Sequence, residues 1–95
     1  MTPSLTIRIA YPDDRAALER LATLDARPLP VEPLLVAEVD GEPWAAVSLA
    51  DGGAVADPFR PSGALVDLLQ ARRGQLAAAG RRPRLARVTS ALRFA

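Results

Sequence analysis

The chain has 95 residues, 49% of them hydrophobic, and its 12 basic and 11 acidic side chains give a formal net charge of +1 at pH 7. It contains no cysteine, histidine or lysine, which excludes disulfides, thiolate chemistry, the usual zinc ligand sets, a histidine base and lysine-dependent catalysis. A domain of this size buries only about 60 to 65% of its unfolded surface, so a second copy is expected to cover an apolar face.

The charges are unevenly distributed along the chain. Residues 1–80 hold all eleven carboxylates against seven arginines, a net charge of −4, whereas residues 81–95 hold five arginines and no acid. We therefore expect one domain over residues 1–80 and a basic tail over residues 81–95. The chain has no run of about 18 apolar residues and no basic N-terminal region followed by a long apolar core, so a cytoplasmic protein is expected.

The first predicted elements are a strand and a helix. Alternation of apolar and other residues predicts a strand whose buried face carries Leu5, Ile7, Ile9 and Tyr11. Pro12 suits the first turn of a helix, and Asp13 and Asp14 favour the positive end of its dipole. The helix is expected over residues 12–25, with an apolar face made of Ala17, Leu18, Leu21 and Leu24.

Residues 34–57 predict a three-stranded meander, which an extended connection with three prolines precedes. The apolar run 34–39, the hairpin turn at residues 40–41 and the returning strand 44–49 are followed by a short strand over residues 54–57. In the returning strand, one face is expected to carry Ala45, Val47 and Leu49, and the other Trp44, Ala46, Ser48 and Ala50. Small residues therefore dominate both faces of this strand.

A second helix is predicted between Ser62, a candidate N-cap, and Gly80, a natural stop. The helical spacing predicts one face that carries Leu65, Leu68, Leu69, Arg72 and Leu76. The tail fits a strand, a helix or a mobile segment, and we favour the last two. The element order predicts an α+β domain, β-α-β-β-β-α, with a mainly antiparallel sheet and helices packed on it.

Two stretches resemble the N-terminal half of the GNAT acyltransferase superfamily. They are the strand-to-helix junction Ala10-Tyr11-Pro12-Asp13-Asp14 and the hairpin Val36-Ala37-Glu38-Val39-Asp40-Gly41-Glu42-Pro43. Members of that superfamily commonly have an R-x-A-x-P-x-D-like junction and a V-A-E-x-D-G-x-x-V-G-like hairpin. The resemblance covers residues 5–57.

The resemblance also implies where acetyl-CoA would bind. The superfamily places an R/Q-x-x-G-x-G/A loop at a helix N-terminus, and the corresponding residues here are Arg60-Pro61-Ser62-Gly63-Ala64-Leu65. It implies a pyrophosphate held by the charge of Arg60 and the amides of Gly63, Ala64 and Leu65, with Glu38 or Asp57 as the base. However, Pro61 has no amide hydrogen, and Leu65 replaces a small residue. No later stretch supplies the superfamily's final strands or the tyrosine that often serves it as the acid.

The sequence therefore predicts a truncated, GNAT-like domain that acts without catalysis as a homodimeric or partner-binding module. Its dimer is expected to bury either the small-residue sheet face or an open edge strand, and no cofactor or metal site is expected. One alternative is an acetyl-CoA-dependent N-acetyltransferase. Another is binding of nucleic acid or a membrane surface through Arg81, Arg82, Arg84, Arg87 and Arg93. The acidic domain and scarce aromatic residues argue against nucleic acid, and the short tail argues against a membrane.

Overall fold

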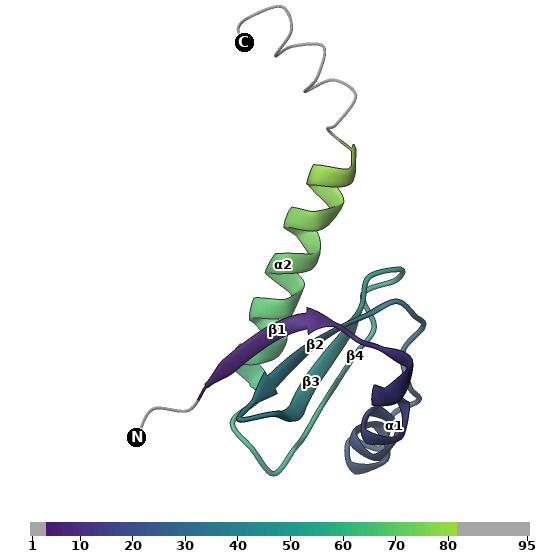
Figure 1. Ribbon diagram of the computed structural model, residues 1–95, viewed down its shortest axis with the longest axis vertical. Helices are drawn as coiled ribbons and strands as arrows, with labels where there is room; N and C mark the ends of the chain where they lie inside the picture. Colours follow the sequence, from purple (N-terminus) through teal and green to yellow (C-terminus); the bar gives the residue numbers. More distant parts are fainter. Residues whose placement is uncertain (1–3, 82–95) are drawn as a thin grey trace, which may run out of the picture.

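The computed structural model describes residues 4–81, and its elements follow the predicted order (Figure 1). They are β1 (Leu5–Ile9), the 3-10 turn η1 (Pro12–Asp14), α1 (Arg15–Leu24), β2 (Leu34–Val39), β3 (Glu42–Ser48), β4 (Ala54–Ala56) and α2 (Gly63–Arg81). The four strands form one antiparallel sheet in the order β1-β2-β3-β4. The predicted α+β class is confirmed. Within these residues, neither helix is long and apolar enough to cross a membrane.

The β2–β3 hairpin is the most locally determined part of the fold. Asp40 and Gly41 both have positive φ angles, 52° and 83°. A two-residue hairpin turn requires this conformation, which aspartate tolerates and glycine adopts freely. The bounds of β2 agree with the sequence prediction, whereas Pro12–Asp14 forms a 3-10 turn ahead of α1 instead of its first turn.

The central strands are buried on both faces over most of their length, where apolar or small residues occupy both sides, while Glu38 and Glu42 lie near the hairpin turn. The cluster beneath α1 consists of Leu18, Leu21, Ala22, Leu34, Val36, Ala46 and Val55. The cluster beneath α2 consists of Leu35, Ala37, Ala45, Val47 and Leu69, with Leu49 packed against it. The predicted alternation of Ala45 and Val47 against Ala46 is therefore confirmed. Trp44 joins neither cluster, and it lies where the β2–β3 register shifts, between the pairs Ala37–Ala45 and Glu38–Pro43.

The predicted burial of one face of β1 is wrong. Leu5 and Ile9 are 46% and 43% exposed and Tyr11 is exposed as well, while Ile7 alone packs against the cluster beneath α2. The reason is the position of α2, which packs mainly on β3, with contacts to β2 and β4 on either side. The apolar side of β1 therefore has no helix over it.

The predicted apolar face of α2 is also largely wrong. Of its residues only Leu69 is buried and Leu65 half-buried, whereas Leu68, Arg72 and Leu76 are exposed. The amide of Gln70 donates a 2.9 Å hydrogen bond to the carbonyl of Gly52, which turns that flank of α2 toward the β3–β4 connection. The second half of α2 projects beyond the sheet (Figure 1) and continues through Gly80, the predicted stop, to Arg81.

Candidate functional site

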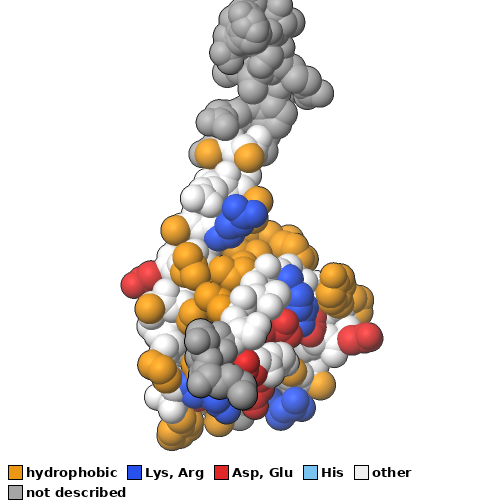
Figure 2. All heavy atoms as spheres, turned by 60° about the vertical axis from the view of Figure 1, so that its left-hand side comes forward, with side chains coloured by type: hydrophobic (Ala, Val, Ile, Leu, Met, Phe, Trp, Pro, Cys, Tyr) orange, Lys and Arg blue, Asp and Glu red, His pale blue; other side chains and the backbone are white. Residues whose placement is uncertain are grey.

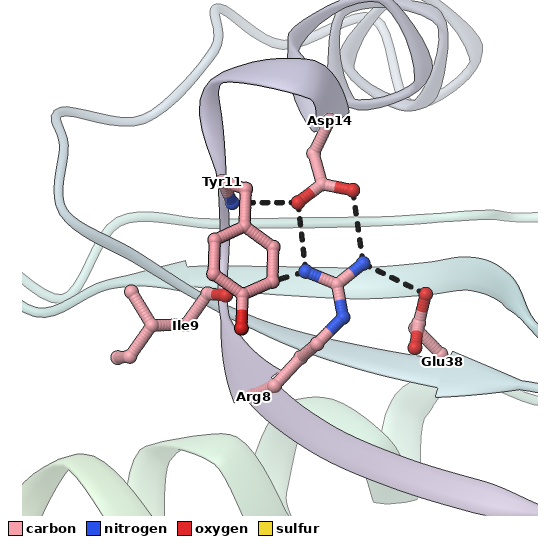
Figure 3. A network of polar contacts seen from close by, with 5 residues as sticks. All are labelled: Arg8, Ile9, Tyr11, Asp14 and Glu38. Atoms are coloured by element: carbon pink, nitrogen blue, oxygen red, sulfur yellow. Dashed lines mark hydrogen bonds and ion pairs between the residues drawn. The ribbon is translucent and has the colours of Figure 1, made fainter.

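The first polar cluster joins β1, η1 and β2 around one arginine (Figure 3). The Arg8 guanidinium donates to both carboxylate oxygens of Asp14, at 2.7 and 2.9 Å, and to Glu38 Oε2 at 2.8 Å. The three side chains are between 16% and 23% exposed. Arg8 also lies over the ring of Tyr11, 5.2 Å from its centre. Because bidentate arginine–carboxylate pairs are strong and directional, this network fixes β1 to the start of α1.

Charge and hydrogen bonding reinforce each other at Asp14. The Arg8 guanidinium lowers the pKa of Asp14 from its ordinary value of 3.8 to about 2, and the hydrogen bond from the Tyr11 amide, 2.6 Å long, contributes to the same shift. Asp14 in turn raises the pKa of Arg8, and Glu38 adds to that effect. Glu38, a predicted base, therefore faces a permanently charged donor.

Sequence reasoning missed the two residues that define this cluster. Asp14 lies three residues after Tyr11 at the start of a helical segment, which is the spacing at which an acidic side chain accepts a hydrogen bond from a preceding amide. Arg8 occupies the polar side of the alternating strand β1, directly opposite Val36 and diagonal to Glu38. The capping spacing was a usable signal for Asp14, while the pairing with Glu38 required the strand register.

A second polar cluster gathers residues from β3 and the connection after β4. Arg60 Nη2 lies 2.9 Å from Glu42 Oε1, and Arg60 Nε lies 3.2 Å from Asp57 Oδ2. The guanidinium also sits 4.8 Å from the centre of the Trp44 ring, at a distance suited to a cation–π contact. The other oxygen of Asp57 accepts a 2.8 Å hydrogen bond from the Phe59 amide. Two carboxylates thus oppose the charge of Arg60.

The predicted phosphate donors Gly63, Ala64 and Leu65 form the first turn of α2. Ser62 precedes them as predicted, and its carbonyl accepts a 3.0 Å hydrogen bond from the Leu65 amide. Its buried hydroxyl donates instead to the carbonyl of Asp57, at 2.8 Å, and so ties the helix start to the end of β4. The Leu65 amide is already used within the helix.

The structure thus distributes the predicted site residues over two clusters. Asp57 and Arg60 contact each other just before α2, whereas Glu38 belongs to the Arg8 network. Among residues 4–81, no three acidic side chains come together as a metal site would require. The arginine-rich tail beyond Arg81 lies outside the described residues, so binding of nucleic acid or a membrane by that tail stays a prediction.

A third candidate is apolar, and it is the surface that α2 leaves open. We define the β1–α2 surface as Leu5, Ile7, Ile9, Leu65, Leu68 and Leu76. Four of these are exposed, and Ile7 and Leu65 are half-buried in the cluster beneath α2. Figure 2 shows hydrophobic side chains gathered where α2 meets the rest of the domain. Apolar surfaces of this kind typically mark sites of association.

Comparison with protein-family models, with curated proteins and with solved structures found no match for this chain. The resemblance of residues 5–57 to the GNAT superfamily stays a prediction. Within residues 4–81, the charges of the two polar clusters are paired internally, whereas the β1–α2 surface exposes apolar side chains.

The Arg8 network predicts a specific acid sensitivity. Because the folded state lowers the pKa of Asp14 from 3.8 to about 2, this carboxylate stabilises the fold above about pH 4 and loses that contribution between pH 4 and pH 2. Asp14→Asn should lower the free energy of unfolding at pH 7 by about 1 kcal/mol, after allowing for solvent screening. The matched control is Asp13→Asn, since Asp13 is exposed in the same turn.

Urea unfolding of these variants between pH 7 and pH 2.5 measures the effect. The difference between wild type and Asp14→Asn should shrink below pH 4, while Asp13→Asn stays close to wild type. A difference that is constant over this range would contradict the assigned role of the ion pair.

Proposed function

We propose that this chain is a non-catalytic interaction module that forms a homodimer through the β1–α2 surface, on a scaffold like the N-terminal half of a GNAT domain. The observation that carries the proposal is the exposed apolar side of β1. Leu5 and Ile9 lie exposed on an ordered strand whose Ile7 packs, as Leu65 of α2 does, against the cluster beneath α2, so association would cover them without refolding the domain. A 10.1 kDa chain gains stability from such association because its own core is thin.

The polar clusters support a role without catalysis. A general base needs a carboxylate that can take a proton from a substrate. Glu38 is hydrogen-bonded to Arg8, and Asp57 is bonded to Arg60 and to the Phe59 amide. Both predicted bases therefore have structural partners within the domain, and these partners connect segments of the fold to one another.

The scaffold proposal is supported by the order of the elements. A strand, a helix, an antiparallel meander and a second helix follow one another as the resemblance implies. The small side chains of β3 allow both helices to pack closely on the sheet. Because both helices lie over the strands beyond β1, the outer strand β1 is the one that the helices cover least.

Sedimentation at tens of micromolar tests the homodimer. We expect the mass of a dimer for the wild type and of a monomer for Leu68→Asp, because a charge on the exposed flank of α2 opposes burial of the β1–α2 surface. The matched control is Leu24→Asp on α1, since Leu24 is 49% exposed and Leu68 is 43% exposed. The control should remain dimeric. A monomeric wild type at this concentration would contradict the proposed homodimer.

Calorimetric titration with acetyl-CoA tests the alternative, an acetyltransferase. We expect no heat and no thermal shift at millimolar ligand, because two carboxylates oppose the charge of Arg60, Pro61 has no amide hydrogen and the Leu65 amide is bonded within α2. Micromolar binding that disappears in Arg60→Ala would instead favour a cofactor site at the start of α2. Plain CoA serves as the second ligand.

A further inference from the structure

Within residues 4–81 no strand pairs with the outer edge of β1, and the strand register identifies which backbone groups lie on that edge. The amide of Ala10 donates to the carbonyl of Leu34, and the amide of Asp40 donates to the carbonyl of Ser4. In an antiparallel pair, successive residues turn their N–H and C=O groups alternately toward the partner strand and away from it. Even-numbered residues of β1 therefore bond to β2, and the backbone groups of Leu5, Ile7 and Ile9 point away from the sheet.

The opposite edge of the sheet is better protected. β4 has only three residues, and the amide of Ala56 donates a 3.0 Å hydrogen bond to Asp25 Oδ2 at the end of α1. Short edge strands and capped amides are common ways in which proteins prevent edge-to-edge pairing. β1 has five residues, and among residues 4–81 its outward backbone groups form one contact, a 3.2 Å hydrogen bond from Arg8 Nη1 to the carbonyl of Ile9.

The residues with outward backbone groups are also those of the apolar stripe. Leu5, Ile7 and Ile9 place their side chains on the α2 side of the sheet, while Thr6 and Arg8 lie on the α1 side. A strand that pairs with this edge would therefore gain main-chain hydrogen bonds and apolar neighbours at the same three positions. Such coincidence of open backbone and apolar side chains favours addition of a strand.

We propose that the occupant of this edge is β1 of a second copy, in an antiparallel pair whose two-fold axis passes through Ile7. This inference rests on the homodimer proposed above and specifies its register. Ile7 would face Ile7 of the partner subunit, and Leu5 would face Ile9 of the partner subunit. The two sheets would join into one of eight strands with a continuous apolar stripe on the α2 side.

The sequence of β1 is self-complementary in this register and in no neighbouring one. Centring the pair on Ile7 uses all three outward-facing residues and places Thr6 opposite the partner's Arg8, so no like charges meet. Centring it on Thr6 leaves Ile9 without a partner. Centring it on Arg8 places two guanidinium groups directly opposite each other, which is unfavourable. A second copy therefore fits the edge better than an arbitrary extended peptide.

Cysteine cross-linking in the full chain tests the register, because the natural chain has no cysteine. In the proposed pair the two Ile7 positions face each other with Cα atoms about 5.5 Å apart, within the range of about 4.4 to 6.8 Å that a disulfide spans. Ile7→Cys should form a covalent dimer under mild oxidation. Thr6→Cys is the matched control and should remain uncross-linked, since Thr6 faces the partner's Arg8.

A charge exchange across the outer pair provides a second test. Leu5→Lys should raise the dimer dissociation constant by roughly tenfold or more, because two outer pairs are weakened in each dimer. Adding Ile9→Glu should recover most of that loss, since opposite charges then face each other in both outer pairs. Ile9→Lys combined with Leu5→Lys should give no recovery.

The outcomes separate this inference from the homodimer itself. A wild-type dimer in which Ile7→Cys does not cross-link and Ile9→Glu recovers none of the loss caused by Leu5→Lys would overturn the pairing register while leaving the homodimer through the β1–α2 surface intact. A monomeric wild type would overturn both. Cross-linking of Ile7→Cys together with charge recovery would establish the register.

Discussion

The position of α2 is the constraint on which the rest of the structure depends. The sheet needs cover on both faces, because most positions of its central strands carry apolar or small residues on either side. One helix is available for each face. The hydrogen bond from Gln70 to the Gly52 carbonyl, together with the Arg73 side chain close to Gly52, holds α2 over β3 and away from β1. β1 therefore remains the uncovered strand, and the open surface follows from how few helices residues 4–81 form.

The Arg8 network makes this uncovered strand an ordered one. An edge strand with an exposed apolar face gains little stability from burial of its own side chains. β1 is nevertheless bonded to β2 along its length and to the start of α1 through Arg8 and Asp14. The ion pairs lie on the α1 side, which leaves the α2 side and the outer edge open. The Arg8 network thus fixes the strand that carries the proposed interaction surface, whereas the Arg60 cluster joins β3 to the connection after β4.

Local features of the fold were predictable from the sequence, whereas features set by distant contacts were not. Asp40-Gly41 determines the hairpin by itself, since both residues adopt positive φ. The alternation in β1 identified its apolar side but carried no information on whether a helix would cover it. In the same way, the helical spacing of α2 placed Leu68 on an apolar face but carried no information on whether the sheet would cover that face. Glu38, Asp57 and Arg60 were recognised as charged candidates, but their partners were not. Arg8 and Glu38 lie 30 positions apart, and only the strand register brings them together.

Amide hydrogen exchange as a function of protein concentration tests the central claim most directly, because it reads the outer edge of β1 without any substitution. If β1 pairs with β1 of a second copy, the amides of Ile7 and Ile9 are protected at high concentration and lose protection on dilution, while those of Thr6 and Arg8, which bond to β2, stay protected throughout. Fast exchange of the Ile7 and Ile9 amides at every concentration, beside protected Thr6 and Arg8 amides, would contradict this pairing.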